Sequence, residues 1–206
     1  MNTTAISSIL GPRFDIVSED LARALPYLNL PSNAAVLDVG TGSGNCAIYL
    51  ATQGYRVLTG EPATDRSLYS GRDWVSAARQ VGVLDKIKFQ AFDASSIPFA
   101  AGEFEAVFFF GVLHHIDEAE RRKVFQEALR VTKPGGSVVF FEPQSQMLHK
   151  VRADDPAHPP AADPSAYLTS EAVREQRVTG SWMDIFIYRQ TGTQPSTCSL
   201  KGTWVD

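Results

Sequence analysis

An aspartate followed by three regularly spaced glycines is the feature of this sequence most suited to chemistry. Asp38 comes directly after the apolar run AAVL, and Gly40, Gly42 and Gly44 follow at alternating positions before the helix-like stretch NCAIYLATQ. Glycine lacks a Cβ, so such a turn bends sharply and passes close to a ligand, and the helix start after it offers unpaired N–H groups. A carboxylate beside free N–H groups suits a ligand with both an ammonium and a carboxylate group. The sequence therefore predicts a turn that binds the head group of an amino acid.

Two nucleotide-binding motifs are similar to this turn, and both fit it less well. The dinucleotide fingerprint has the spacing G-x-G-x-x-G, whereas the glycines here are spaced G-x-G-x-G, and Asp38 stands two residues before the first of them. A carboxylate at that position would repel a pyrophosphate. The lysine that a phosphate-binding P-loop requires after its glycines is also absent. A zwitterionic ligand is therefore favoured over a phosphate.

Further chemistry-bearing side chains follow other apolar runs. They are Glu61, Asp93, the pair His114-His115, and Glu142. For one carboxylate at the end of a strand, a helix cap or a solvated loop is the simpler interpretation. Several at successive strand ends, with a glycine turn among them, favour a binding site, because ligands of open parallel sheets bind beyond the carboxyl ends of the strands.

Apolar runs and helical periodicity alternate along the chain and would place these groups at one edge. The predicted strands are 34–39, 55–60, 86–92, 103–110 and 137–141. Helices are predicted at 12–24, 45–53 and 74–81 and after Asp117. Strands at 172–178 and 182–189 would form a hairpin that completes the sheet. The expected fold class is α/β, a doubly wound, mostly parallel seven-stranded sheet with a C-terminal antiparallel hairpin.

One domain is expected over residues 1–206, made of a helical segment (1–30), a core (34–143), a loop (144–170) and the hairpin (171–190). Residues 1–11 are small and polar, and no ordered element is predicted there. The loop contains the proline-rich stretch RADDPAHPPAADPSA. Its Asp154, Asp155 and His158 are of metal-ligand type, but the flexibility and solvent exposure of such a loop favour no metal site, and none is predicted.

Composition limits the partners. The chain has 44% hydrophobic residues, a formal charge of −4 and no basic cluster, which argues against a nucleic-acid partner. Cys46 and Cys198 form no C-x-x-C motif, so neither a disulfide framework nor a zinc ribbon is expected. The N-terminus does not have the pattern of a signal peptide, and no apolar run is long enough to span a membrane. We therefore expect a cytoplasmic protein with a small-molecule partner and no membrane partner.

Five successive motifs resemble those of class I S-adenosylmethionine-dependent methyltransferases, especially the small-molecule branch that includes quinone-biosynthesis enzymes. They are VLDVGTGSG, GEP, FDASSIPF, FEAVFFFGVLHHI and ALRVTKPGGSVVFFEP, and they run in order from Ala34 to Pro143. The resemblance implies a Rossmann-like methyltransferase fold, S-adenosylmethionine as cofactor with S-adenosylhomocysteine as product, and transfer of a methyl group to an O, N or S atom of a small molecule.

The resemblance also assigns the cofactor's parts to residues. The methionine part would be held by the turn and by backbone groups at the end of the fourth strand, that is by Asp38, Gly40, Thr41, Gly42, Gly44, Phe110 and Gly111. The nucleoside part would be held by four residues: Glu61 on the ribose hydroxyls, Pro62 against the adenine, and Asp93 and Ala94 on the adenine nitrogens.

The catalytic assignment stays open between two residues. His114 and His115 are candidate bases because imidazole titrates near neutral pH, yet adjacent side chains point in different directions, so at most one is expected to face the substrate. A structural role for the pair, or one on the cofactor side, is equally compatible with the sequence. Glu142 is a further candidate on the substrate side, and Tyr69, Arg72 and Trp74 are candidates to reach over the cofactor or substrate.

Two alternatives to a small-molecule enzyme remain. One is a regulatory or partner subunit that binds S-adenosylmethionine without transferring its methyl group, and the other is a tRNA or protein methyltransferase. The segment 144–170 is shorter than the cover found in many relatives. The acceptor pocket is therefore expected to be shallow, closed by the N-terminal segment, or completed by a second subunit in a homodimer.

Overall fold

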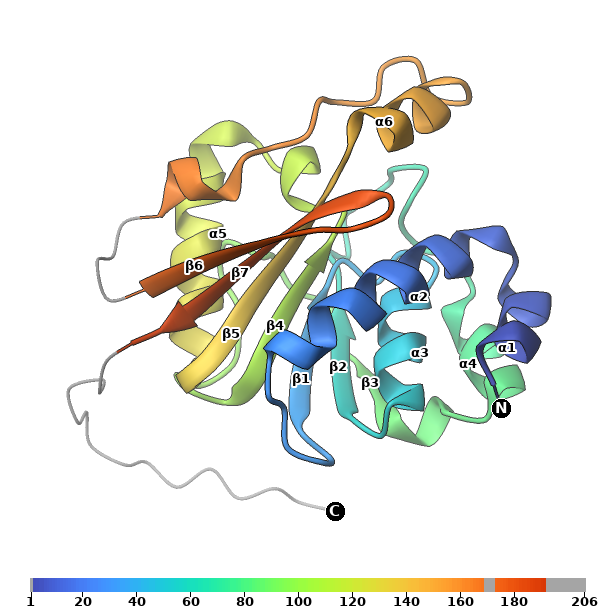
Figure 1. The fold of residues 1–206 in the computed structure, drawn as a ribbon, viewed down its shortest axis with the longest axis horizontal. Helices are drawn as coiled ribbons and strands as arrows, with labels where there is room; N and C mark the ends of the chain where they lie inside the picture. Colours follow the sequence, from blue (N-terminus) through green and yellow to red (C-terminus); the bar gives the residue numbers. More distant parts are fainter. Residues whose placement is uncertain (1, 169–172, 192–206) are drawn as a thin grey trace.

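A central seven-stranded sheet organises residues 2–168 and 173–191, the part of the chain that the computed structural model describes (Figure 1). The strand order is β3-β2-β1-β4-β5-β7-β6; β7 runs antiparallel to both of its neighbours, and the other pairs are parallel. The strands are β1 (Ala35–Val39), β2 (Arg56–Gly60), β3 (Ile87–Phe89), β4 (Phe104–Phe110), β5 (Thr132–Pro143), β6 (Val173–Thr179) and β7 (Met183–Gln190). The predicted fold class is confirmed.

Helices cover both faces of the sheet. They are α1 (Thr3–Leu10), α2 (Pro12–Ala24), α3 (Asn45–Thr52), α4 (Trp74–Val81), α5 (Glu118–Val131) and α6 (Ser145–Arg152). Figure 1 shows α1 to α4 together on one side, α5 on the other, and α6 beyond the ends of the central strands. The carboxyl edge of the sheet is therefore covered by the segment that follows β5.

The two central strands are apolar on both faces, as strands between two helical layers must be. Along β4, Phe108 packs into the core beneath α2 and α3, while Phe109 packs into the core beneath α5. Phe109 stacks on Phe140 of β5 with ring centroids 4.6 Å apart, and Phe140 stacks on Phe125 of α5 at 5.2 Å. All four rings are buried, and burial of each contributes about 2–3 kcal/mol. This core fixes the ends of β4 and β5.

A buried aspartate joins α2 to the β6–β7 turn. Asp20 is fully buried; its Oδ1 accepts the N–H of Ser181 (2.5 Å), and its Oδ2 accepts those of Trp182 (3.0 Å) and Met183 (2.8 Å). A Cβ on Gly180 would lie 2.5 Å from Oδ1, so the turn needs glycine there. Burial raises the pKa of Asp20, although the three N–H donors act to lower it. This carboxylate accepts the N–H groups of the turn, which would otherwise lack hydrogen-bond acceptors.

The expectation for the N-terminus was wrong, because residues 3–10 form helix α1. The Asn2 side chain accepts the N–H of Ala5 (2.9 Å) and so caps the helix, and Ile6 is buried against the core. A cap and one buried anchor are enough to order a segment that looks featureless in sequence.

The expected loop 144–170 is also not a simple loop, since it begins with α6 and contains a 3₁₀ turn at Pro164–Tyr167. Met147 of α6 packs against the core, and the N–H of Gln144 donates to the carbonyl of Trp182 (3.0 Å). In addition, β5 begins at Thr132, five residues before its predicted start, and β3 is shorter than predicted. Ala172 at the start of the predicted hairpin and the tail containing Cys198 lie outside the described residues.

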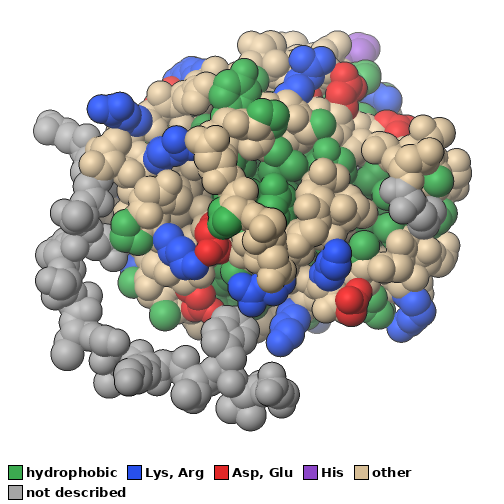
Figure 2. Space-filling view, turned by 60° about the horizontal axis from the view of Figure 1, so that its bottom comes forward, with side chains coloured by type: hydrophobic (Ala, Val, Ile, Leu, Met, Phe, Trp, Pro, Cys, Tyr) green, Lys and Arg blue, Asp and Glu red, His purple; other side chains and the backbone are tan. Residues whose placement is uncertain are grey.

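Charge is mixed on the surface that Figure 2 draws. Lys and Arg side chains are scattered there among Asp and Glu, with hydrophobic side chains between them, and no continuous basic surface is visible on that face. Among the helices that the structure describes, none combines the length and the apolar character needed to cross a membrane.

Candidate active site at the carboxyl ends of the strands

The carboxyl ends of the neighbouring strands β1 and β4, called here the β1–β4 crevice, form the switch point of the sheet. The chain continues from β1 toward β2 and β3 on one side, and from β4 toward β5 on the other, so the connections diverge between them. Crevices at such points are the binding sites of open α/β sheets. Asp38 lies near the end of β1, paired in register with Thr59 of β2 and Phe108 of β4.

Asp38 is fully buried and only partly satisfied. Its Oδ2 accepts the hydroxyl of Thr59 (2.8 Å), which in turn lies 2.9 Å from the hydroxyl of Thr41. Cys46 adds a weak thiol donor, yet Oδ1 is buried without a hydrogen-bond partner in the described part of the chain. Burial raises the pKa of Asp38 to about 7. An unpaired buried carboxylate oxygen is costly, and such atoms mark places where a ligand donor belongs.

The glycine turn is packed too tightly for side chains. Gly40 has φ +88°, and a Cβ there would lie 2.6 Å from a methyl group of Val112. Gly44 has φ +75°, and its Cβ would lie 2.6 Å from Cβ of Trp74. Val112, which follows β4, and Trp74, which begins α4, therefore press on the two ends of the turn. Trp74 was expected to reach over the cofactor or substrate. Its side chain packs against the turn, the core and the ring of Phe89, whose centroid lies 6.2 Å away.

Glu61 joins the glycine turn to the segment after β2. Its Oε2 accepts the N–H of Gly42 (2.9 Å), and its Oε1 accepts the N–H of Gly71 (2.8 Å). Each carboxylate oxygen has a second lone pair, so both can still accept from a ligand. Pro62, the next residue, is exposed beside it.

Asp93 and Ala94 lie on the loop after β3 rather than directly at its end. Oδ1 of Asp93 accepts the N–H of Ser95 (2.7 Å), which folds the loop into a tight turn, and Ala94 is buried. The N–H of Phe92 donates to the carbonyl of Glu61 (3.3 Å). The structure thus brings this loop beside Glu61, as the sequence predicts.

Phe110 and Gly111 end β4 on the other side of the crevice. The ring of Phe110 stacks on Phe141 at 4.7 Å, so its side chain serves packing, and the N–H of Gly111 donates to the carbonyl of Phe141 (2.9 Å). Gly111 has φ +68°, and a Cβ there would lie 3.9 Å from Cε1 of His114. The backbone of Gly111 therefore lies beside the imidazole of His114 at the end of β4.

His114 and His115 have different surroundings, as expected of adjacent residues. His114 is buried, and its Nδ1 donates to Oε2 of Glu142 (2.8 Å), which also accepts the N–H of Ala162 (2.9 Å). Oε1 of Glu142 is buried without a hydrogen-bond partner among the described residues. His115 is exposed, and its ring lies 5.1 Å from that of Tyr69.

A third histidine completes the group. His158 is buried, and its ring centroid lies 5.1 Å from that of His114 and 4.8 Å from that of His115. The Tyr69 hydroxyl donates to Oδ2 of Asp155 (2.9 Å) and lies 3.2 Å from Nδ1 of His158. Although His115 as a whole is exposed, partial loss of water around its ring and the neighbouring imidazoles lower its pKa to about 4. Burial and the charge of His114 also lower the pKa of His158. We call His114, His115 and His158 the histidine cluster.

Sequence reasoning missed the place of His158 and the role of Val112. His158 lies 43 residues after His115 in a proline-rich stretch, and no spacing rule connects them. Of the candidates after β2, Tyr69 does reach the histidine cluster. Tyr69 and Arg72 also line a hollow of about 160 Å³ together with α2 and residues 151–155.

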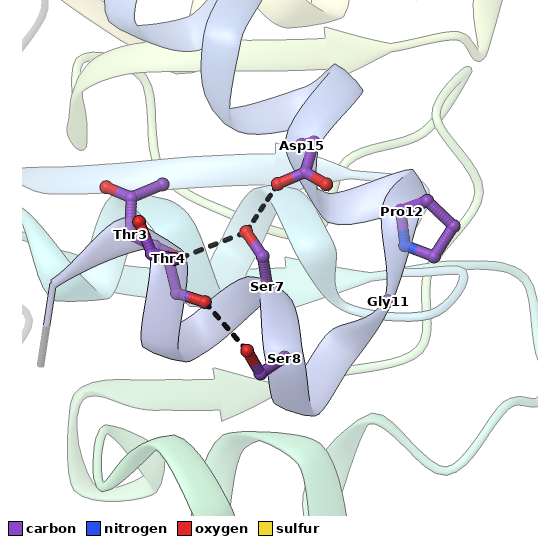
Figure 3. A pocket seen from close by; sticks show the side chains of 7 residues that line it. All are labelled: Thr3, Thr4, Ser7, Ser8, Gly11, Pro12 and Asp15. Carbon is purple, nitrogen blue, oxygen red and sulfur yellow. Dashed lines mark hydrogen bonds between the residues drawn. The ribbon is translucent and has the colours of Figure 1, made fainter.

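A larger hollow, about 440 Å³, lies between α1 and the start of α2 (Figure 3). Its hydroxyls are engaged locally: those of Ser7 and Ser8 donate to the carbonyls of Thr3 (3.0 Å) and Thr4 (3.1 Å), and Ser7 also bonds Asp15. None of the site residues predicted from sequence lines it. We therefore place the site in the β1–β4 crevice.

Comparison with known proteins shows the family of this chain. A family model described as a methyltransferase domain matches residues 37–140, about half of the chain. The 27-O-demethylrifamycin SV methyltransferase of Amycolatopsis mediterranei is 31% identical over 60% of this chain and 43% of its own. The ubiquinone/menaquinone biosynthesis C-methyltransferase UbiE of Geotalea daltonii is 29% identical over 65% of this chain and 59% of its own.

A solved structure shares the fold as well. The YcgJ protein of Bacillus subtilis superposes with a TM-score of 0.61 at 22% identity, covering 78% of this chain and 70% of its own. The chain spans 43% and 59% of the length of the two relatives above. The chain belongs to the class I S-adenosylmethionine-dependent methyltransferases, and S-adenosylmethionine is its cofactor.

Proposed function

We propose that this protein transfers the methyl group of S-adenosylmethionine to a small molecule. The observation that carries the proposal is the unpaired, buried Oδ1 of Asp38 beside the glycine turn. The ammonium group of the cofactor can donate a hydrogen bond to such an oxygen. The carboxylate of the cofactor can accept hydrogen bonds from the N–H groups at the start of α3. Family membership supports the cofactor, and the orphaned oxygen supports the place of its amino-acid part.

The remaining assignments extend the same argument along the carboxyl edge. Glu61 would accept from the ribose hydroxyls through the lone pairs that Gly42 and Gly71 leave open. The exposed face of Pro62 and the loop at Asp93 and Ala94 would hold the adenine. Backbone groups of Phe110 and Gly111 would border the methionine part. Each of these positions lies in or beside the crevice.

The bound cofactor would supply a methyl group already activated as part of a sulfonium cation. The chain's own contribution is alignment of the acceptor and exclusion of water, which together contribute several kcal/mol in such reactions. Tyr69, His158 and the segment that follows β5 would form a cover over the site, because the two rings pack beside His114 and His115. Hydrogen bonds from His114 and Ala162 to Glu142 hold that cover against the end of β5.

Of the two candidate bases, His115 fits proton abstraction better. The Nδ1 of His114 is committed to Glu142, and its ring is buried, so we assign His114 a positioning role. The ring of His115 is exposed, and its low pKa keeps the imidazole unprotonated at physiological pH, while the same shift makes it a weaker base. The acceptor's methylated atom is proposed to be O, N or S, although one relative is named a C-methyltransferase, so carbon belongs in any substrate screen.

Calorimetry with S-adenosylmethionine and S-adenosylhomocysteine tests the first half of the proposal. We expect one site per chain with a dissociation constant in the micromolar range, and no binding at 10- to 100-fold higher concentration would contradict it. Transfer of labelled methyl groups to a metabolite extract tests the second half. Binding without any transfer would favour the alternative, a regulatory or partner subunit, and labelled tRNA or protein would favour a macromolecular acceptor.

A further inference from the structure

The histidine cluster has the composition and geometry of a transition-metal site. One ring nitrogen from each of His114, His115 and His158 lies within 4.8 Å of the other two. Zinc binds imidazole nitrogen at about 2.0–2.1 Å, which places the nitrogens of a tetrahedral site about 3.3 Å apart. Small side-chain rotations would close the remaining separation. We propose that these three histidines bind a divalent transition metal of the Zn²⁺ type.

The hydrogen bonds around the cluster orient two of the three rings for this role. Oε2 of Glu142 accepts from Nδ1 of His114, which leaves Nε2 of that ring as the nitrogen available for a metal. The Tyr69 hydroxyl gives its proton to Asp155, so its oxygen can accept from Nδ1 of His158. Histidine ligands in metalloproteins commonly donate their second ring nitrogen to a carboxylate or similar acceptor, which fixes the tautomer. His114 and His158 both have that arrangement.

A second, independent observation points to a missing positive charge. Oε1 of Glu142 is buried without a hydrogen-bond partner among the described residues, and the whole side chain is only 1% exposed. A buried carboxylate is costly unless a cation or donors compensate it. A metal bound by His114 would lie one imidazole away from this carboxylate and would stabilise it. Neutral histidines that donate hydrogen bonds do not compensate the charge of this carboxylate.

The location suggests what such a metal would do. The cluster lies where β4 and β5 end, beside Gly111 and next to the proposed cofactor site. Three protein ligands leave a fourth position open, as in catalytic rather than structural zinc sites. An acceptor with a hydroxyl or thiol group would bind there as the anion and release its proton to water, which favours O or S over N as the methylated atom. This last step rests on the proposed function; the metal site does not. With the metal bound, His115 would serve as a ligand in place of the base role proposed above.

Direct metal binding tests the inference without any activity assay. The full chain, free of an affinity tag and treated with a chelator that is then removed, is titrated with zinc chloride, and cobalt chloride provides a spectroscopic check. We expect one equivalent bound at micromolar or tighter dissociation constant and a visible absorption band of four-coordinate Co²⁺. Less than about 0.2 equivalents, or binding only at millimolar zinc, would overturn the site.

Variants locate the metal. His158→Ala and the exposed His115→Ala are expected to weaken zinc binding at least 50-fold, and Glu142→Gln by about 10- to 100-fold. His149→Ala is the matched control, because His149 is the remaining histidine of the chain, is exposed on α6, and should leave binding unchanged. Equal affinity in wild type and His115→Ala would overturn the assignment even if His158→Ala fails to fold, and unfolding scans without metal identify that case.

The two proposals fail separately. Zinc binding with no binding of S-adenosylmethionine would leave the metal site standing and contradict the proposed function. Cofactor binding with no zinc binding would do the reverse. Copper or nickel binding at one equivalent with the same variant pattern supports the site and changes only the metal's identity.

Discussion

Two fully buried aspartates, Asp20 and Asp38, differ in how their carboxylate oxygens are satisfied. Asp20 receives three backbone N–H groups, which satisfy both of its oxygens. Asp38 receives the Thr59 hydroxyl on Oδ2, while Oδ1 has no hydrogen-bond partner within the described residues. Burial raises the pKa of both carboxyl groups. We propose that Asp20 serves the fold, whereas Asp38 is held at a cost in stability for a ligand.

The first prediction removes the carboxylate that serves the fold. Asp20→Ala leaves one buried and two partly buried N–H groups without their acceptor, so the free energy of unfolding should fall by about 3–5 kcal/mol. Urea unfolding followed by circular dichroism measures it. Asp20→Asn, which keeps one acceptor oxygen, should lose less and bind S-adenosylmethionine within about twofold of wild type. A loss of stability below 1 kcal/mol in Asp20→Ala would contradict the claim that Asp20, unlike Asp38, stabilises the fold.

The second prediction uses pH to expose the cost of Asp38. Its pKa is about 7 in the folded chain and near 3.8 in the unfolded chain. Between these values the folded state keeps a proton that the unfolded state has released, so stability falls as pH rises from about 4 to 7 and is constant above 7. The loss amounts to at most about 4 kcal/mol.

Comparison with Asp38→Asn isolates this effect from Asp20, which contributes with the same sign. The apo Asp38→Asn protein should be more stable than wild type at pH 8 and nearly equal to it at pH 4.5, as measured by urea unfolding at both values. A wild type that gains stability relative to Asp38→Asn as pH rises would contradict the assigned direction of the shift. Cofactor affinity should change in the opposite sense, rising through pH 7 as Asp38 ionises.

The third prediction compares the glycine that lies next to each aspartate. Gly180→Ala would bring a Cβ to 2.5 Å from Asp20 Oδ1 and from a backbone carbonyl, and should cost about 2 kcal/mol of stability without changing cofactor affinity. Gly40→Ala would meet Val112 at 2.6 Å and should cost a similar amount while also weakening cofactor binding. Adding Val112→Ala should recover part of that stability, but not the roughly 1 kcal/mol due to positive φ. If Gly180→Ala weakens cofactor binding as much as Gly40→Ala does, the division between the regions fails.

The smallest predicted effect concerns the hydroxyl that donates to Asp38. Thr59→Val removes the hydroxyl bound to Oδ2 and should lower stability by about 1 kcal/mol. Cofactor affinity should fall a few-fold, because the remaining carboxylate is harder to ionise. Thermal unfolding and calorimetry on the same preparation measure both quantities. Tighter cofactor binding in Thr59→Val would contradict the claim that this hydroxyl helps Asp38 to ionise and bind the cofactor.

Local patterns predicted the fold and the position of Asp38 beside a tight glycine turn. The apolar runs before Asp38 and Glu61 correspond to β1 and β2, and the glycine spacing correctly located a tight turn, since these features depend only on neighbouring residues. Asp20 gave no such signal, because a charged residue within an amphipathic helix looks solvent-exposed in sequence. Its partners lie more than 160 residues away and are backbone groups, which have no signature in sequence.

The histidine cluster shows the same limit. The sequence placed His114 and His115 at the end of a strand, but it assigned His158 to an exposed loop. Its burial depends on α6, which folds residues 145–152 over the carboxyl edge, and on Tyr69, 89 residues before His158. Long-range packing of a proline-rich segment is set by what it covers rather than by its own periodicity.

Calorimetric titration of wild type, Asp38→Asn and Asp20→Asn with S-adenosylmethionine at pH 8 tests the central claim most directly. We predict that Asp38→Asn weakens binding about 100-fold, equivalent to about 2.7 kcal/mol, although its apo form is at least as stable as wild type. Asp20→Asn should bind almost as wild type does while being less stable. Equal affinity in wild type and Asp38→Asn would contradict the account, because the buried, unpaired oxygen would then have no ligand to explain it.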